Sequence, residues 1–525
     1  MSGSDILVVG AGPTGLTLAL QAHDHGARVR VVDQRSGPSR PSRAMIVHPR
    51  TLEVLRPLRV IDALLARGDR RPTVELHLGR HLIDAGLTDF ELADTAYPHL
   101  LLIRQTDVEA VLLAAAAERG LHVEWDTAFE SYLLDSGKAI ATVRPGGEPA
   151  HIEARFLVGA DGSTSTVRAT AGITFDGASY PVDIVLADIE LTDGAGPGPA
   201  HAVAGRDGLV FLFPLGEQAT WRLLATVPAM PSLQPFGQVG PPVPRAEIDR
   251  LIDRSGINVR VAHVAWSARV RVQHRISSRY RVGPVLLAGD AAHTFSPAGG
   301  QGMNTGIQDA TNLGWKLALL STRSVPAGAL LASYEAERRD IARMTLALTH
   351  LLFWVEAGTG MVPSFLRGTV GPLAAPLVPV LLRQRRLTAL GIRVLSQLCW
   401  NYRHSPLSLG AELGGRQQRS APHGHPGDRL PDATVLTGSG HHRLHELMAT
   451  AGLHILLQRN AEPLTISDDL VHVHRVLSWP GRSAVVVRPD GHIGYRGPTT
   501  DAENWLEPLG LASTAKHHLR AHRVP

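Results

Sequence analysis

The chain has 525 residues, 44% of them hydrophobic, so it is long enough for two or three domains with large buried cores. Lys and Arg barely outnumber Asp and Glu (52 against 48), and no basic stripe with interleaved aromatic residues is evident, which argues against a nucleic-acid partner. The single cysteine, Cys399, excludes an intrachain disulfide and a cysteine-based zinc cluster, and it is typical of the reducing cytoplasm.

The N-terminus is predicted to open with a βαβ unit. Segments 5–10 and 28–33 have the composition of buried strands, and 16–25 between them that of a helix. The first strand has neither the basic flank nor the cleavage site of a signal peptide. Further along, helices are expected at 50–67 and 107–119.

The pattern changes between about residues 180 and 272. The apolar runs DIVLADIEL, GLVFLFPL, TWRLLATV and HVAWSARVRV indicate an antiparallel sheet. A buried strand of the parallel type returns at 282–288, and helices follow to about residue 402. The apolar stretch 344–382 is interrupted by prolines and charged residues, so we expect no bilayer-spanning segment and no stable membrane association.

These patterns predict an α/β protein of three domains. Residues 1–179 and 273–400 are expected to form a discontinuous, Rossmann-like dinucleotide-binding domain. Residues 180–272 form an antiparallel-sheet domain for the substrate. A linker rich in Pro, Gly and His covers 401–426, and a C-terminal domain occupies 427–525.

The motif GAGPTG follows the first strand and carries the first chemical signal. Its glycines allow a sharp turn and let the backbone approach a pyrophosphate, whose charge lies at the positive end of the following helix. Asp33, which ends the second strand, is placed to accept hydrogen bonds from both ribose hydroxyls of an adenosine. We therefore predict a dinucleotide site; a glycine-rich turn that serves packing alone is the alternative. The motif residues are Gly10, Gly12, Pro13, Thr14 and Gly15.

A second loop, rich in glycine, follows the strand at 282–288. Asp290 is expected to bind the ribityl hydroxyls of a flavin, and Gly299, Gly300 and Gly302 let the chain pass close to a flat ring. Backbone N–H groups around Met303 and Asn304, at the start of a helix, would face the flavin N1–C2=O edge and favour its anionic reduced form. A loop that only caps the helix is the alternative.

Three motifs in this order resemble the single-component, FAD-dependent monooxygenases of the aromatic hydroxylase family. They are GAGPTG with Asp33, GADGSTSTVR at 159–168, and GDAAHTFSPAGGQGMNTGIQDATNLGWKLA from Gly289. The likeness covers about residues 4 to 400. It implies non-covalent FAD, with further contacts from Arg43 to the ribose or pyrophosphate, from Gln105 to the ribityl chain and from the loop of Asp161. The alternatives are that Arg43 and Arg168 are ordinary surface charges and that Asp161 is a plain turn residue.

The resemblance also implies the reaction. No second GxGxxG motif follows, so NADPH or NADH would dock transiently over the flavin, and a two-domain disulfide reductase is excluded by the lack of a cysteine pair. Reduced FAD would react with O2 at C4a, and the hydroperoxide would transfer oxygen to an electron-rich ring. Hydroxylation, epoxidation and insertion beside a ketone stay open.

Candidate catalytic and substrate residues follow from this chemistry. Pro297 lies where the family's loop faces C4a, and its carbonyl region would steady the peroxide. His48 or Arg50 could favour a substrate phenolate, although His48 as a structural residue is the alternative. The pocket is expected between the flavin and the antiparallel sheet, where four aromatic residues either line it or fill the core, and no metal site is expected. They are Phe211, Phe213, Trp221 and Trp266.

The tail resembles the thioredoxin-like C-terminal domain of phenol hydroxylases and aromatic polyketide hydroxylases. RPDGHIGYR at 488–496 is its most characteristic segment. The tail lacks CxxC, so a structural role or an oligomer contact, as in a homodimer, is expected instead of redox exchange. This branch favours a polycyclic aromatic polyketide as substrate; small phenols and an antibiotic to be inactivated are alternatives. A non-catalytic flavin-fold binding protein is the alternative of another class, and the intact Asp290 loop favours the enzyme.

Overall fold

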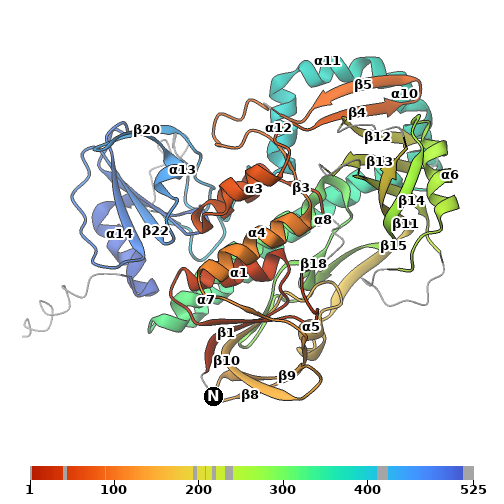
Figure 1. The fold of residues 1–525 in the computed structure, drawn as a ribbon. Coiled ribbons are helices and arrows are strands. Elements are labelled where there is room, and N and C mark those ends of the chain that lie inside the picture. Colours follow the sequence, from red (N-terminus) through yellow and green to blue (C-terminus); the bar gives the residue numbers. More distant parts are fainter. Residues whose placement is uncertain are drawn as a thin grey trace, which may run out of the picture.

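The computed structural model describes residues 3–38, 44–88, 90–192, 198–206, 208–215, 220–230, 240–410 and 424–511. Three sheets define three parts of the molecule. In Figure 1 the sheet that contains β1 and β10 lies at the bottom, the sheet that contains β11 to β15 lies at the upper right, and the C-terminal domain lies at the left. The predicted α/β class, with its antiparallel second sheet and thioredoxin-like tail, is confirmed.

The first sheet has the strand order β16-β17-β10-β1-β2-β7, and a β8–β9 hairpin pairs with β10. Four of these neighbouring pairs are parallel, and the central strands are buried apolar runs where they pair: ILVV in β1, FLVG at the end of β10 and VLL in β17. The strands are β1 (Ser4–Val9), β2 (Val29–Val32), β7 (Val123–Glu124), β8 (Thr127–Asp135), β9 (Lys138–Pro145), β10 (Ala150–Gly159), β16 (Arg281–Val282) and β17 (Val285–Leu287).

Helices α1, α4 and α7 cross the middle of the molecule beside this sheet (Figure 1). α7 packs closely on α1 because Gly314 has no side chain: a Cβ there would lie 2.8 Å from the Cβ of Gln21. The helices of this domain are α1 (Pro13–His23), α2 (Pro49–Leu55), α3 (Ile61–Arg67), α4 (Gln105–Glu118), α5 (Thr166–Thr170), α7 (Gln301–Thr322) and α8 (Ala327–Ala357); two short strands, β3 (Ile46–Val47) and β6 (Leu101–Leu102), pair beside them.

The second sheet has the order β18-β15-β11-β14-β13-β12-β4-β5. Its strands are β4 (Thr73–Leu78), β5 (His81–Gly86), β11 (Phe175–Leu191), β12 (Ala200–Gly205), β13 (Gly208–Pro214), β14 (Thr220–Pro228), β15 (Val261–Ser277) and β18 (His293–Thr294). The domain boundaries therefore differ from the sequence prediction. The β4–β5 hairpin belongs to this sheet, because β4 pairs in parallel with β12. In addition, β11 begins before residue 180 and β15 ends after residue 272.

The two faces of the second sheet have different neighbours. One face packs under α6 (Arg245–Ser255), where Leu223 and Ile248 are fully buried. The opposite face turns toward the loop after β18 and toward α8: Ile184 and Val272 pack there with Ala298. Because side chains alternate along a strand, the position of each residue decides which of these faces it serves.

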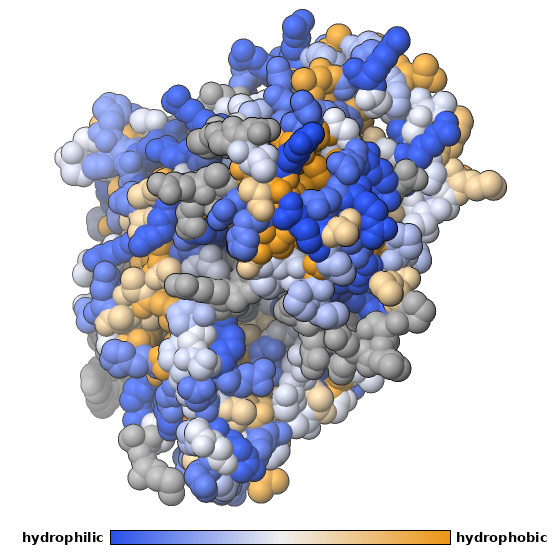
Figure 2. Space-filling view, turned by 45° about the vertical axis from the view of Figure 1, so that its right-hand side comes forward, coloured by the Kyte–Doolittle hydropathy of each residue, from blue (hydrophilic) through white to orange (hydrophobic). Residues whose placement is uncertain are grey.

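A group of short helices follows α8 and leaves many apolar side chains exposed. Met361 is 90% and Leu373 77% exposed, and Figure 2 shows hydrophobic surface near the top of the molecule, where Figure 1 places α10 and α11. By length and composition alone, the 23-residue stretch 361–383 could cross a membrane, and 11% of its apolar window is buried. The helices are α9 (Met361–Phe365), α10 (Gly371–Ala374), α11 (Val378–Arg383) and α12 (Arg385–Leu395), with one π turn between α9 and α10.

The C-terminal domain is built on a five-stranded sheet of order β19-β25-β24-β22-β23, in which β22 and β23 are parallel. Its elements are β19 (Leu409–Gly410), β20 (Thr434–Thr437), β21 (Gly440–Arg443), α13 (Leu444–Leu447), β22 (Leu453–Gln458), β23 (Val471–Val476), β24 (Ser483–Val487), β25 (Ile493–Pro498) and α14 (Thr499–Leu506). The segment RPDGHIGYR leads from β24 into β25, and its buried Arg488 contacts Glu337 of α8. The tail thus docks on the first domain.

Candidate active site

The two glycine-rich motifs meet at Thr14, in the first turn of α1. A Cβ added to Gly289 would lie 2.5 Å from the Thr14 hydroxyl oxygen, and one added to Gly306 of α7 would lie 2.4 Å from it. The Thr14 side chain therefore fits between two backbone segments that only glycine permits there. Loops almost 300 residues apart in the sequence share one site, as expected for a dinucleotide held at both ends.

The GAGPTG loop has the shape that a pyrophosphate needs. Gly10 adopts φ +105°, and a Cβ there would lie 2.3 Å from the carbonyl oxygen of Ala160. Gly12, by contrast, has no atom of the described residues within 4 Å of where its Cβ would be, so its backbone is open on that side. Gly12 is also the N-cap of α1, without a side-chain cap among the described residues, and Pro13 begins the helix. The residues present thus fit the pyrophosphate of FAD at a free helix N-terminus.

Asp33 lies where an adenosine ribose is expected, at the end of β2. One of its oxygens accepts the N–H of Ala11 at 2.7 Å, and Arg35 donates to both carboxylate oxygens at 3.0 and 3.1 Å. Arg35 also pairs with Glu109, to which Gln105 donates a hydrogen bond of 2.9 Å. Asp33 and Gln105 therefore belong to one polar network, and sequence reasoning missed Arg35 and Glu109 within it. Arg43 lies outside the described residues.

The central motif connects the first loop to the second. Asp161 lies beside Gly10 and accepts the N–H of Val167 at 3.1 Å; burial raises the pKa of its carboxyl group. Arg168 donates to the carbonyl oxygens of Ser163 and Ala291 at 2.8 and 2.9 Å. It is 9% exposed, so it is no solvated surface charge: it fastens the Asp-Gly loop to the turn that contains Asp290.

The second loop is held in shape by side-chain bonds to its backbone. Asp290 is exposed in the turn Gly289–Ala291, and a Cβ on Gly302 would lie 3.8 Å from its Oδ1. Gly300, with φ +63°, is the N-cap of α7, and Met303 lies in the first turn. The side chain of Asn304 donates to the carbonyl oxygen of Gly300 at 2.7 Å. The first turn of α7 has no side-chain cap among the described residues. The backbone N–H groups at this positive end of the helix can therefore face the ring of a bound flavin.

His48 supports this loop from the other side. Its backbone N–H donates to Asn304 Oδ1 at 2.9 Å, and its Nε2 lies 2.8 Å from the carbonyl oxygen of Gly299. Burial lowers the pKa of His48 to about 4, and the hydrogen bond to Gly299 only partly offsets this. His48 is thus neutral and 1% exposed, and its hydrogen bonds support the loop. This is the structural role that the sequence analysis gave as the alternative.

Arg50 does not join these residues. Its guanidinium donates to the carbonyl oxygen of Asp490 at 2.6 Å and to Glu53 at 3.1 Å, and it lies 3.2 Å from His492. It is 3% exposed in the contact between α2 and the C-terminal domain. The hypothesis that Arg50 favours a substrate phenolate is not supported by this position.

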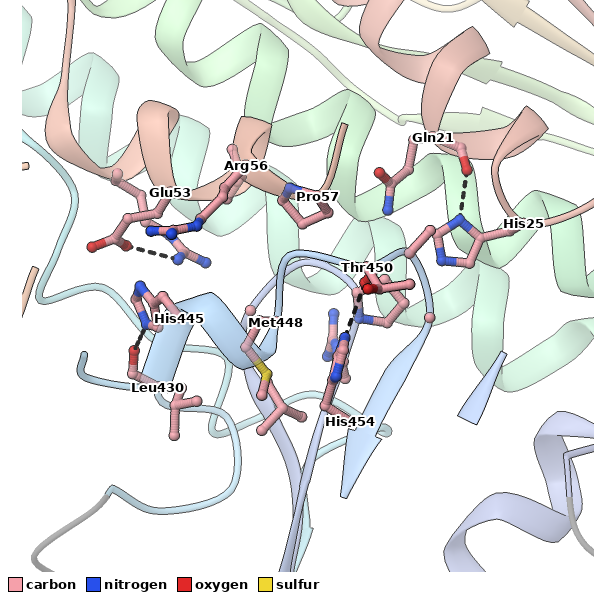
Figure 3. A pocket seen from close by; sticks show the side chains of 18 residues that line it. Gln21, His25, Glu53, Arg56, Pro57, Leu430, His445, Met448, Thr450 and His454 are labelled. Carbon is pink, nitrogen blue, oxygen red and sulfur yellow. Dashed lines mark hydrogen bonds and ion pairs between the residues drawn. The ribbon is translucent and has the colours of Figure 1, made fainter. Parts of the chain in front are cut away.

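The contact around Arg50 also encloses a small cavity (Figure 3). Its volume is about 30 Å³, and its walls come from α1, α2 and the C-terminal domain, with Gln21, His25 and His445 among the labelled side chains. This space suits one or two water molecules and is far too small for FAD or an aromatic substrate. It is separate from the two glycine-rich loops.

The substrate-side aromatic residues fall on both faces of the second sheet. Phe211 stacks on Phe213 with centroids 5.3 Å apart, and Phe211 pairs in register with Leu224, which packs on the face toward Ala298. Trp266 is on that same face. Trp221 is on the other face, 3% exposed in the core beneath α6, which is the core-filling alternative that the sequence left open.

The loop carrying Pro297 borders this face. Pro297 is exposed, its carbonyl oxygen accepts the N–H of Gly300 at 2.9 Å, and the next residue, Ala298, packs on the sheet. The carbonyl oxygen of Pro297 therefore already has one hydrogen-bond partner within its own loop.

Sequence reasoning missed a polar cluster beside this loop. The Tyr180 hydroxyl lies 2.9 Å from Nδ1 of His350, and the His274 ring lies 4.8 Å from that of Tyr180. Burial raises the pKa of Tyr180 to about 12. The nearby Ser296 hydroxyl donates to the carbonyl oxygen of Thr349 in α8 at 2.9 Å. These residues come from β11, β15 and α8, and no local motif marks any of them.

Comparison with known proteins agrees with this geometry. Residues 3–349 match a family model described as an FAD binding domain, and residues 423–516 match the aromatic-ring hydroxylase C-terminal domain. The 6-methylpretetramide 4-monooxygenase of Streptomyces rimosus is 36% identical over 97% of this chain and 94% of that protein. The rifampicin monooxygenase of Streptomyces venezuelae is 30% identical, covering 94% and 95%.

A solved structure shares the whole architecture. The anhydrotetracycline hydroxylase of Streptomyces rimosus superposes with a TM-score of 0.77 at 28% identity, covering 98% of this chain and 100% of that one. The family model covers more than half of the chain, and the first relative spans nearly all of it. The chain belongs to the FAD-dependent aromatic monooxygenases.

Proposed function

We propose that this enzyme inserts one oxygen atom of O2 into a polycyclic aromatic polyketide and consumes NADPH or NADH. The observation that supports the proposal most is that the GAGPTG loop and the backbone at Gly289 and Gly306 meet at Thr14, while Ala298 of the second loop packs on an apolar sheet face. When bound, FAD supplies the hydride acceptance and the dioxygen activation. The chain's own residues bind the cofactor, orient the ring system and exclude water.

The proposed substrate space lies between the loop at Pro297–Gly300 and the sheet face that carries Phe211, Phe213 and Trp266. Flat aromatic side chains on this face suit a flat, multi-ring guest. The names of two similar proteins, for 6-methylpretetramide and anhydrotetracycline, support a polyketide. A hydroxyl of the guest would meet the Tyr180–His350 pair, which can accept or return a proton there.

The remaining parts of the proposal concern the setting of the enzyme. We place it in the cytoplasm, where its single cysteine stays reduced and nicotinamide cofactors are supplied. The nicotinamide would reach the flavin without a domain of its own. A homodimer is the proposed assembly, because α9 to α12 leave several large apolar side chains exposed, among them Met361 and Leu373, and exposed apolar patches often mark protein–protein contacts.

The test is a rapid-mixing experiment on the purified, FAD-loaded enzyme. Under anaerobic conditions, NADPH and NADH are each mixed with it in the presence of polycyclic polyketide phenols, small phenols or no substrate. We expect a polycyclic compound to accelerate bleaching of the flavin most, and in air to give a product heavier by one oxygen atom. If only small phenols accelerated flavin bleaching, the substrate would be a small phenol and not a polyketide. A protein that binds the polyketide but neither bleaches nor consumes O2 would be a flavin-fold binding protein.

A further inference from the structure

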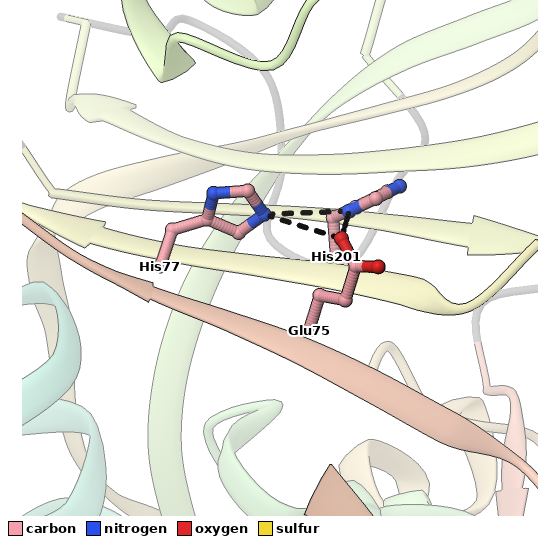
Figure 4. Close-up of side chains that lie close together, drawn as sticks. All are labelled: Glu75, His77 and His201. Atoms are coloured by element: carbon pink, nitrogen blue, oxygen red, sulfur yellow. Dashed lines mark hydrogen bonds and ion pairs between the residues drawn. The ribbon is translucent and has the colours of Figure 1, made fainter. Parts of the chain in front are cut away.

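Three side chains that offer metal ligands meet on the second sheet, away from the flavin loops (Figure 4). In the parallel pair β4–β12, Glu75 lies directly opposite His201. His77 is two residues beyond Glu75, so its side chain is on the same face of the sheet. The three residues therefore point toward one another because of the strand register, and β4 and β12 are far apart in the sequence.

The ligand atoms stand at distances that suit a tetrahedral ion. Nδ1 of His201 is 3.1 Å from Oε2 of Glu75 and 3.3 Å from Nε2 of His77. The third edge, from His77 Nε2 to the same Glu75 oxygen, is 4.0 Å. Ligands held 2.0–2.1 Å from a tetrahedral zinc ion stand about 3.3 Å apart, so the triangle is close to the size that such an ion requires.

The surroundings leave this cluster free to bind. The side chains are 25%, 24% and 16% exposed for Glu75, His77 and His201, so water can complete a coordination shell. Among the ion pairs of the described residues, Glu75 has no Lys or Arg partner that would neutralise it. The Trp221 ring lies nearly parallel to that of His201, with centroids 6.1 Å apart, and forms one wall beside the imidazole.

The position of the cluster separates it from the monooxygenase chemistry. His201 is stacked on Trp221, which lies in the core under α6, on the face opposite Phe211 and Trp266. We propose that Glu75, His77 and His201 bind one divalent transition-metal ion of the zinc type, with water as the remaining ligand. The ion would clamp the β4–β5 hairpin to β12 and so join the two distant chain segments of this sheet. The proposal does not depend on the identity of the aromatic substrate.

The experiment is a metal titration of the FAD-loaded enzyme after dialysis against a chelator. Cobalt(II) is added first, because a tetrahedral cobalt site gives strong visible bands, and difference spectra remove the flavin signal. We expect one cobalt ion per chain with such bands, displacement by zinc, and a higher thermal midpoint with either metal. Weak, non-tetrahedral absorption, or no binding at all, would overturn the proposal.

Variants separate this cluster from the other histidines of the chain, 26 in all. His201→Ala and the conservative Glu75→Gln are expected to weaken cobalt binding by at least about 100-fold, since even an outer-shell partner can cost 10–100-fold. His263→Ala, which removes an exposed histidine of β15, should leave the titration unchanged. Flavin content and circular dichroism show that each variant is folded. Equal binding by the His201 and Glu75 variants and the natural chain would reject the site.

Discussion

Arg488 of the C-terminal domain donates two hydrogen bonds, of 2.6 and 2.7 Å, to the carboxylate of Glu337 in α8. Both side chains are fully buried, and Lys316 donates to the same carboxylate at 2.8 Å. Arg488 also pairs with Asp490. The segment RPDGHIGYR is thus explained by its contact with the first domain: it supplies the charges that fasten the tail to α7 and α8.

Breaking this pair should be costly. Glu337→Gln leaves the Arg488 guanidinium buried with a weaker partner, and we expect it to lower the free energy of unfolding by about 3–5 kcal/mol. The measurement is denaturant unfolding followed by tryptophan fluorescence. Glu153→Gln is the control, because it removes a half-exposed partner of Lys138 and should cost less than about 1 kcal/mol. Equal losses in the two variants would contradict the role of the buried pair.

Acid should release the same contact. Burial alone would raise the pKa of Glu337, but the charges of Arg488 and Lys316 override it and lower the pKa to about 2, from an ordinary value of 4.5. The stabilisation is therefore complete above pH 4.5 and is lost as the pH falls from 4.5 toward 2. Unfolding free energies measured across this range should decline less steeply in Glu337→Gln. An unchanged slope would show that other carboxylates dominate.

The junction at Thr14 can be tested with one added methyl group. Gly306→Ala would place a Cβ 2.4 Å from the Thr14 hydroxyl, and we expect weaker FAD retention and a lower thermal midpoint. Gly391→Ala in α12 is the matched control, because no atom in the described part of the chain lies within 4 Å of its Cβ position. That helical substitution should be neutral or stabilising by about 0.5–1 kcal/mol. Full flavin occupancy in Gly306→Ala would argue against the junction.

The two faces of the second sheet predict different phenotypes for two aromatic residues. Phe211→Ala should raise KM for the aromatic substrate and slow substrate-stimulated flavin reduction, with a small effect on stability. Trp221→Ala should cost about 3–5 kcal/mol of stability through a core cavity and leave KM nearly unchanged in the folded fraction. Steady-state kinetics and thermal unfolding of both variants decide this. The reverse result would mean that the substrate lies on the α6 side.

His48 is expected to stay uncharged during catalysis. Its pKa of about 4 means that it carries no proton charge above about pH 6, so no step in the pH–rate profile there arises from its titration. His48→Gln should loosen the Gly299 loop and reduce flavin retention without moving the apparent pKa values of kcat/KM. His350→Gln, in contrast, should move them if the Tyr180 pair exchanges a proton with substrate. If only the His48 variant changed the pH–rate profile, His48 would be the catalytic base after all.

Local patterns explain what the sequence could predict. The GAGPTG and GDAAH motifs each combine a strand, a glycine turn and a helix in one short segment, so their elements were predicted close to where they lie. Alternating apolar residues gave the antiparallel sheet in the same way. The parallel β4–β12 pair, the Tyr180–His350 bond and the Arg50–Asp490 contact join residues more than a hundred positions apart. No local signal marks such pairs, because register and domain docking create them.

The discontinuity of the first sheet has a consequence for how the protein matures on the ribosome. β10 pairs on one side with β1 and on the other with β17, and everything from Ala160 to Pro284 is synthesised between the two strands. At about 5–20 residues per second, the emerging chain waits several seconds or longer with one edge of that sheet unpaired. The nascent polypeptide can therefore bring its two glycine-rich loops together only after strands β11 to β15 of the second sheet have been translated. FAD binding is then expected late in synthesis.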